Sequence, residues 1–190
     1  MSTPSTADEI TSPDNSISHA PDTARIMHWS IYGRPGAPST TRATASSWKH
    51  KPFSKPVTRP WSHVIPSSEL PKLLNGFIPN QMEDKWFVYT DGPDAQGNAA
   101  VRFFRSWTGY AMVSAKLVMS MDGEGRAKEE DARFTELTWE TDKEMYNGDM
   151  DAPGTVLGVA QWCMGCQLGP KEREGSAAEE NEEEAPAGSS

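Results

Sequence analysis

The chain has 190 residues, an apolar fraction of 36% and a net charge of −9 at pH 7, which fits one domain with extensions. Residues 64–170 hold sixteen acidic and nine basic side chains, and this balance argues against binding nucleic acid, because phosphate backbones require a surplus of Lys and Arg. No apolar run approaches a membrane span and no secretory signal is visible, so we expect no membrane partner and a cytoplasmic or nuclear location.

Residues 1–60 are predicted to be a disordered linker. The first 24 residues are rich in Ser, Thr, Pro and Asp, and no acidic residue lies between Asp22 and Glu69, where seven Lys and Arg residues make the second half basic. Such basic, Ser-rich composition is typical of organellar transit peptides, but this segment starts far from Met1 and its prolines break any helix. We expect Trp48 and Trp61 to dock onto the neighbouring domain.

Residues 61–170 are predicted to form one α+β domain. Leu70, Leu73 and Leu74 share one face of a helix that ends at Gly76. Alternating apolar residues then predict four sequential strands, at 86–90, 101–107, 110–119 and 132–140. Short connections favour an antiparallel meander of about four strands, packed against two helices.

The second helix is predicted over residues 154–168, and a tail follows it. Apolar residues recur there at three- and four-residue spacings, and Gly169-Pro170 provides a stop signal. Residues 171–190 contain seven Glu residues and little to bury, so we predict an acidic disordered tail.

The stretch from Met82 to Tyr110 contains the candidate ligand-binding residues. Antiparallel pairing would bring Glu83 and Asp84, before its first strand, close to Arg105 near the end of its second. A carboxylate and a guanidinium placed there can form a bidentate pair. One interpretation is that this pair only fixes the register of the hairpin.

The other interpretation is a binding site around Arg105. In it, Arg105 points into a cleft, and Ser106, Trp107 and Thr108 supply hydroxyl groups and a stacking surface. Such a site would suit a phosphate, a carboxylate or a nucleotide.

The same stretch resembles a known domain family. Pro79-x-x-Met82-Glu83-Asp84-Lys85-Trp86-Phe87, followed by Arg105-Ser106-Trp107-Thr108-Gly109, is similar to an uncharacterised small domain found in microbial proteins. The resemblance extends over about residues 61–168 and implies a genuine domain, but it implies no activity, cofactor or catalytic residue. The chain departs from that pattern in its long N-terminal extension, its 91–98 loop and its acidic tail.

Two further motifs bear on redox or metal chemistry. Trp162-Cys163-Met164-Gly165-Cys166 has the spacing of a thioredoxin-like site, but it lies at the end of a predicted helix, where the dipole raises rather than lowers a thiol pKa. A single CxxC pair falls short of the four ligands of structural zinc. The acidic run near Asp149 lacks the order of a calcium loop, so we predict no metal and no cofactor.

Two functions remain open from the sequence. The favoured one is a non-catalytic interaction or accessory module with a protein partner, because no nucleophile, metal set or poised histidine lies in the predicted domain. The alternative is a domain that binds or processes a small anionic ligand or nucleotide, with Arg105 as anion clamp and Glu83 or Asp84 as acid or base. The sequence leaves open whether the protein is an enzyme.

Overall fold

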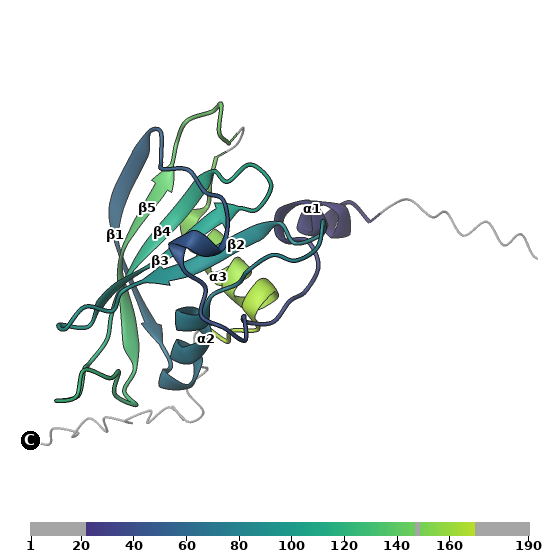
Figure 1. Ribbon diagram of the computed structural model, residues 1–190. Coiled ribbons are helices and arrows are strands. Elements are labelled where there is room, and N and C mark those ends of the chain that lie inside the picture. The colour runs from purple at the N-terminus through teal and green to yellow at the C-terminus, as the bar shows by residue number, and fades with distance from the viewer. Residues whose placement is uncertain (1–21, 147–148, 170–190) are drawn as a thin grey trace, which may run out of the picture.

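The computed structural model describes residues 22–146 and 149–169 (Figure 1). The acidic tail predicted at 171–190, and residues 1–21 of the predicted linker, lie outside the described residues.

A five-stranded antiparallel sheet forms the centre of the domain, and it confirms the predicted α+β class (Figure 1). Its strand order is β1-β5-β4-β3-β2. The four consecutive strands make the predicted meander, and their bounds are β2 (Trp86–Asp91), β3 (Asn98–Arg105), β4 (Ala111–Val118) and β5 (Ala132–Glu140).

The fifth strand, β1 (Pro56–Ile65), was not predicted from the sequence. It forms one edge of the sheet and pairs with β5, with a register shift between Pro60 and His63. Most of its side chains are exposed or half-buried, so it lacks the alternation that reveals a strand. Prolines at positions 56 and 60 are tolerated because an edge strand has N–H groups that need no partner.

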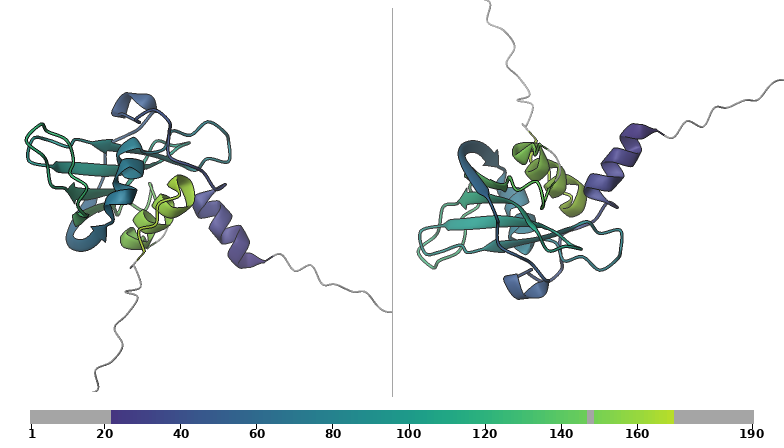
Figure 2. Two further views of the ribbon diagram at one scale, coloured as in Figure 1. Left: turned by 90° about the horizontal axis from the view of Figure 1, so that it is seen from below. Right: turned by 90° about the horizontal axis from the view of Figure 1, so that it is seen from above.

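Two helices cover one face of the sheet, which we call the helical face (Figures 1 and 2). They are α2 (Leu70–Asn75), which follows a short 3₁₀ turn η2 (Ser67–Glu69), and α3 (Ala152–Met164). Helix α3 contacts β4 and β5, and its Val156 and Val159 are fully buried in the main core. Both helices confirm the two predicted from the apolar spacing.

Helix α3 ends earlier than predicted. Gly165 adopts a left-handed conformation with φ of 63°, and the N–H of Cys166 donates to the carbonyl of Ala160 over 3.0 Å. The N–H of Gly165 donates to the carbonyl of Gln161 over 3.0 Å, so the left-handed glycine closes the helix in the αL pattern. Cys166 therefore lies beyond the helix, although its side chain remains buried.

The opposite side of the sheet, the outer face, is partly covered by residues 43–55, which include the 3₁₀ turn η1 (Ala45–Ser47). A second apolar cluster lies beneath this segment, made of Ala43, Phe87, Tyr89, Phe104 and Ala111 with Trp48, Phe53 and Ile78 packed against them. The indole N–H of Trp48 donates to the carbonyl of Ser106 over 2.8 Å. On the helical face, Trp61 stacks on Phe134 with ring centroids 5.3 Å apart. Both tryptophans are docked, as predicted.

A buried carboxylate fastens this outer segment to the end of β5. Glu140 is 2% exposed and accepts main-chain N–H bonds from Ser54 and Lys55, at 2.6 and 2.9 Å, and from Thr141 and Asp142, at 3.0 and 2.9 Å. Burial by itself raises the pKa of Glu140, but these four bonds favour the ionised form and hold its pKa below the usual value. The side chain therefore works as a clamp between β5 and the segment that covers the outer face.

A third helix, α1 (Thr23–Tyr32), lies within the segment predicted to be a linker. Asp22 caps its start by accepting the N–H of Ala24 at 3.1 Å. The helix docks on α3, where the ring of His28 meets Trp162 edge-on at 4.4 Å and Gly158 leaves the space that Tyr32 occupies. None of its residues is buried, so its side chains show no pattern of burial, and its docking on α3 decides its position.

Candidate functional site

The predicted site residues lie at one end of the β2–β3 hairpin, next to helix α1. Trp86 pairs with Arg105 across the hairpin, as the antiparallel arrangement requires. The hydroxyl of the buried Ser106 donates to the carbonyl of Asp84 over 2.5 Å. The hairpin thus brings Asp84, Ser106 and Arg105 into one region, but their side chains have separate partners.

Asp84 pairs with Arg34 and not with Arg105. The Nε of Arg34 lies 2.7 Å from Asp84 Oδ1, and the other carboxylate oxygen accepts the N–H groups of Asn80 and Gln81 at 2.9 and 3.0 Å. Burial by itself raises the pKa of Asp84, but these hydrogen bonds outweigh it and lower the pKa below its usual value. The predicted carboxylate–Arg105 pair is therefore replaced by a brace between the 80–84 turn and Arg34.

The side chain of Glu83 is exposed, and its main chain takes part in a close crossing. Its carbonyl accepts the N–H of Arg34 at 3.4 Å. Gly33, whose φ is 74°, packs directly against the same carbonyl, and a Cβ at this position would overlap the carbonyl oxygen of Glu83. Because only glycine tolerates both that angle and that approach, the crossing fixes where α1 leaves the sheet.

Arg105 binds the end of helix α1. Its Nη1 donates to the carbonyl of Ile31 at 2.8 Å and its Nη2 to the carbonyl of Ser30 at 3.2 Å. The guanidinium lies over the ring of Trp86, 5.0 Å from its centroid, and the indole N–H of Trp86 donates to the same Ile31 carbonyl over 2.8 Å. The last carbonyls of a helix lack partners within it and carry partial negative charge. Arg105 and Trp86 satisfy them and hold α1 against the sheet.

Trp107 and Thr108 form the exposed turn between β3 and β4. The indole N–H of Trp107 donates to the carbonyl of Met82 over 3.1 Å, and the ammonium of Lys85 lies 5.3 Å from its ring centroid. The hydroxyl of Thr108 accepts the N–H of Tyr110 at 3.3 Å. Trp107 remains 52% exposed, so these contacts orient the indole while leaving much of its surface in solvent.

Helix α1, this turn and the end of the sheet enclose a cleft of about 830 Å³, which we call the α1 cleft. Its lining is dominated by methionine and aromatic side chains, namely Met27, Trp29, Trp86, Trp107, Tyr110, Met112, Met145, Tyr146 and Met150. Its charged lining residues, in the described part of the chain, are Lys85 and Arg105. The cleft therefore combines adaptable apolar walls with positive charge.

The sequence predicts one wall of the α1 cleft but not the other. Arg105, Trp107 and Thr108 line it as predicted site residues, whereas α1 contributes Met27, Trp29, Ser30 and Ile31. The remaining lining residues are Lys85, Trp86, Tyr110 and Met112 from the sheet and its turns, and Met145, Tyr146, Met150 and Thr155 further along the chain. The sequence feature that could have indicated the contribution of α1 is the run of bulky apolar residues after the helix cap Asp22. That run is unusual for a solvated linker, but its position in space depends on the docking of α1.

The cysteines of the WCxxC string are buried and free. Burial raises the pKa of both thiols to about 12, and thiolate is the reactive form. Within residues 22–146 and 149–169, no three His, Cys, Asp or Glu side chains gather closely enough to hold a metal ion.

We therefore expect both thiols to act as small apolar core groups. In the folded protein at neutral pH they should resist iodoacetamide and become alkylated only in denaturant. The Cys163→Ala/Cys166→Ala variant should lose about 2 kcal/mol of unfolding free energy, since it leaves two small cavities. Rapid alkylation of the native protein, or zinc retained by the wild type after dialysis and lost in the variant, would contradict this assignment.

Comparisons with known proteins add no relative: no family model, curated protein or solved structure matches the chain. The resemblance of residues 79–87 and 105–109 to an uncharacterised microbial domain stays a prediction. None of the helices in the described parts of the chain has the length and hydrophobicity that a membrane span requires.

Proposed function

We propose that this protein is a non-catalytic interaction module that binds a segment of another protein in the α1 cleft. One observation carries the proposal. Eight large apolar side chains are exposed in the described residues, and five of them line this single cleft: Met27, Trp29, Ile31, Trp107 and Tyr146. Scattered exposed apolar residues are ordinary, but their concentration around one concave site is typical of a binding surface.

The lining of the cleft supports binding rather than catalysis. Among the described residues that line it there is no histidine, cysteine or carboxylate, the groups that most often act as acid, base or nucleophile. Of the two predicted acid or base residues, Glu83 does not line the cleft, and Asp84 is occupied by Arg34 and two main-chain N–H groups. The hydrogen bonds of Arg105 to Ser30 and Ile31 give it a structural role as well.

The chemistry of the walls defines the partner. Methionine side chains adapt to varied apolar shapes, and tryptophan offers a large surface with a polar edge. Lys85 and Arg105 add positive charge, and the cleft has no acidic lining residue in the described chain to neutralise it. We therefore propose a partner segment that carries bulky apolar side chains next to Asp or Glu.

Selection of peptides from a random display library on the full-length chain tests the proposal. Enriched peptides should combine aromatic or aliphatic residues with a carboxylate. Synthetic versions of these peptides should bind the protein in a fluorescence-anisotropy titration. The double variant Trp29→Ser/Trp107→Ser should bind them about tenfold more weakly or worse, because indole side chains dominate such interfaces. Circular dichroism verifies that the variant is folded.

The matched control is Val64→Ser, which removes an exposed apolar side chain from β1, outside the cleft, and should leave the affinity unchanged. Peptides that bind the double variant as well as the wild type would overturn the proposal. So would a screen in which nucleotides or sugar phosphates raise the melting temperature while no peptide is enriched, since that outcome favours a small anionic ligand at Arg105.

A further inference from the structure

Arg102, on the outer face of β3, contains a buried donor without a partner. Its Nε is enclosed and has no hydrogen-bond acceptor among the described residues. Its Nη2 lies 3.5 Å from Asp91 Oδ2, a long contact between two partly exposed side chains. Buried polar atoms are almost always bonded, and an unmet donor on a charged group is costly. Since the Nε is enclosed, an acceptor from outside the chain can reach this partly exposed side chain through its Nη groups.

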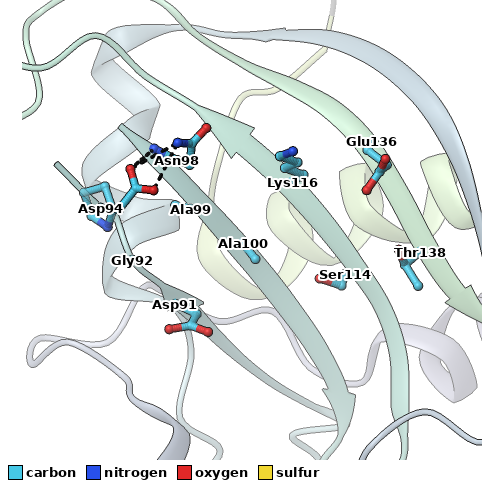
Figure 3. Close-up of a pocket in the computed structure, with 11 residues that line it drawn as sticks. Asp91, Gly92, Asp94, Asn98, Ala99, Ala100, Ser114, Lys116, Glu136 and Thr138 are labelled. Atoms are coloured by element: carbon cyan, nitrogen blue, oxygen red, sulfur yellow. Dashed lines mark hydrogen bonds between the residues drawn. The ribbon is translucent and has the colours of Figure 1, made fainter. Parts of the chain in front are cut away.

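Two hydroxyl groups lie in register with this guanidinium. Arg102 pairs with Tyr89 on β2 and with Ser114 on β4, so the three side chains form a row across the outer face. Figure 3 shows Ser114 beside Lys116 on the same strand, and Thr138 on the neighbouring strand. Burial raises the pKa of the Tyr89 hydroxyl, which keeps it protonated and able to donate.

These three residues line a pocket of about 270 Å³ between the outer face and residues 50–53. Its floor is aromatic: the rings of Tyr89 and Phe104 lie parallel with centroids 5.7 Å apart, and His50 approaches Phe104 at 5.0 Å. Lys51 adds positive charge at the edge. Among the described lining residues there is no carboxylate, so the net charge of the pocket is positive.

We propose that this pocket binds a small aromatic monocarboxylate. The carboxylate accepts from the Nη groups of Arg102 and from the Tyr89 and Ser114 hydroxyls, while its ring packs on Phe104 and Tyr89. A guanidinium edge matches the planar geometry of a carboxylate. The volume equals that of about nine water molecules, which is comparable with the heavy atoms of benzoate. The site lies on the opposite side of the sheet from the α1 cleft and is independent of it.

An NMR titration of the full-length protein with benzoate tests this assignment. Saturable shifts are expected in residues 50–53 and in the paired segments of β2, β3 and β4. Benzamide, an uncharged compound of the same shape, should bind about tenfold more weakly or worse, because it lacks the charge-assisted bonds. Inorganic phosphate, which has no ring, should not compete with benzoate.

Substitutions locate the site. Arg102→Lys keeps the charge but removes the planar guanidinium and should weaken benzoate binding about tenfold. Arg59→Lys, an exposed exchange on β1, should leave benzoate binding unchanged. The double variant Tyr89→Phe/Ser114→Ala should weaken benzoate binding several-fold. It serves as the test of the site if Arg102→Lys fails to fold. The proposal fails if benzoate produces no saturable shifts, if benzamide or phosphate binds equally well, or if folded variants of this row keep the wild-type affinity.

Discussion

Replacing Glu140 by Gln should lower the unfolding free energy by about 3 kcal/mol. The buried carboxylate accepts four main-chain N–H groups through its two oxygens. Glutamine keeps one oxygen and presents an NH₂ group where the other stood, so at least one buried N–H meets a donor instead of an acceptor. Equilibrium unfolding in urea, followed by tryptophan fluorescence, measures the loss.

The same carboxylate makes stability depend on pH. Because the folded-state pKa of Glu140 lies below its unfolded value, its contribution is fully present above the unfolded pKa of about 4.3 and is lost as the pH falls through the folded pKa. The Gln variant cannot titrate there. The stability difference between wild type and variant should therefore be constant near neutral pH and shrink in acid.

Glu136→Gln is the matched control, since Glu136 lies on the same strand in an open pocket of the outer face (Figure 3). Its effect should stay within about 0.5 kcal/mol. Equal stabilities of the two variants would show that the Glu140 clamp does not hold the outer segment to β5.

Replacing Asp84 by Asn should cost a similar amount, about 3 kcal/mol. The Asp84 side chain is 1% exposed, pairs with Arg34 at 2.7 Å and closes the 80–84 turn through Asn80 and Gln81. Asparagine retains one acceptor and loses the charge that Arg34 requires. The carbonyl of Met82 in that turn accepts the indole N–H of Trp107. The variant should therefore also lower the affinity for peptides bound in the α1 cleft.

A double-mutant cycle isolates the Asp84–Arg34 pair. The coupling between Arg34→Ala and Asp84→Ala should reach about 1–3 kcal/mol in urea unfolding, because the two side chains are in direct contact. Glu83→Gln, an exposed carboxylate next in sequence, should change stability by no more than about 0.5 kcal/mol. Strictly additive effects of the two alanine substitutions would show that the ion pair contributes nothing.

The sequence predicts those elements whose side chains are buried in a regular pattern. Strands β2 to β5 follow from alternation such as Val101, Phe103 and their neighbours, and α3 follows from the spacing of Val156 and Val159. Strand β1 and helix α1 were missed because most of their side chains stay exposed. For these two elements the decisive interactions are with residues far along the chain, which local patterns do not reveal.

The contacts of the candidate site divide in the same way: those between neighbouring strands can be predicted from the sequence, and those with distant residues cannot. Antiparallel pairing sets Trp86 opposite Arg105, a relation between neighbouring strands of the kind that a sequence pattern can indicate. Asp84 pairs with Arg34, 50 positions upstream, and Arg105 binds Ile31, 74 positions upstream. Both contacts form only when α1 is docked against the domain. Arg102 was missed for another reason: in sequence it reads as an ordinary outward-facing strand residue, and its isolation appears only in three dimensions.

The position of helix α1 constrains the order in which the protein can assemble during synthesis. Its contacts with Trp162 and Gly158 lie on α3, and the indole of Trp162 donates to the carbonyl of Gly33, which is 129 positions earlier. Until α3 has left the ribosome, the first helix lacks this docking surface, and the ring of Tyr32, which packs beside Gly158 and against the main core, stays in solvent. A nascent chain halted before residue 152 should therefore bind chaperones, and release should coincide with the emergence of α3.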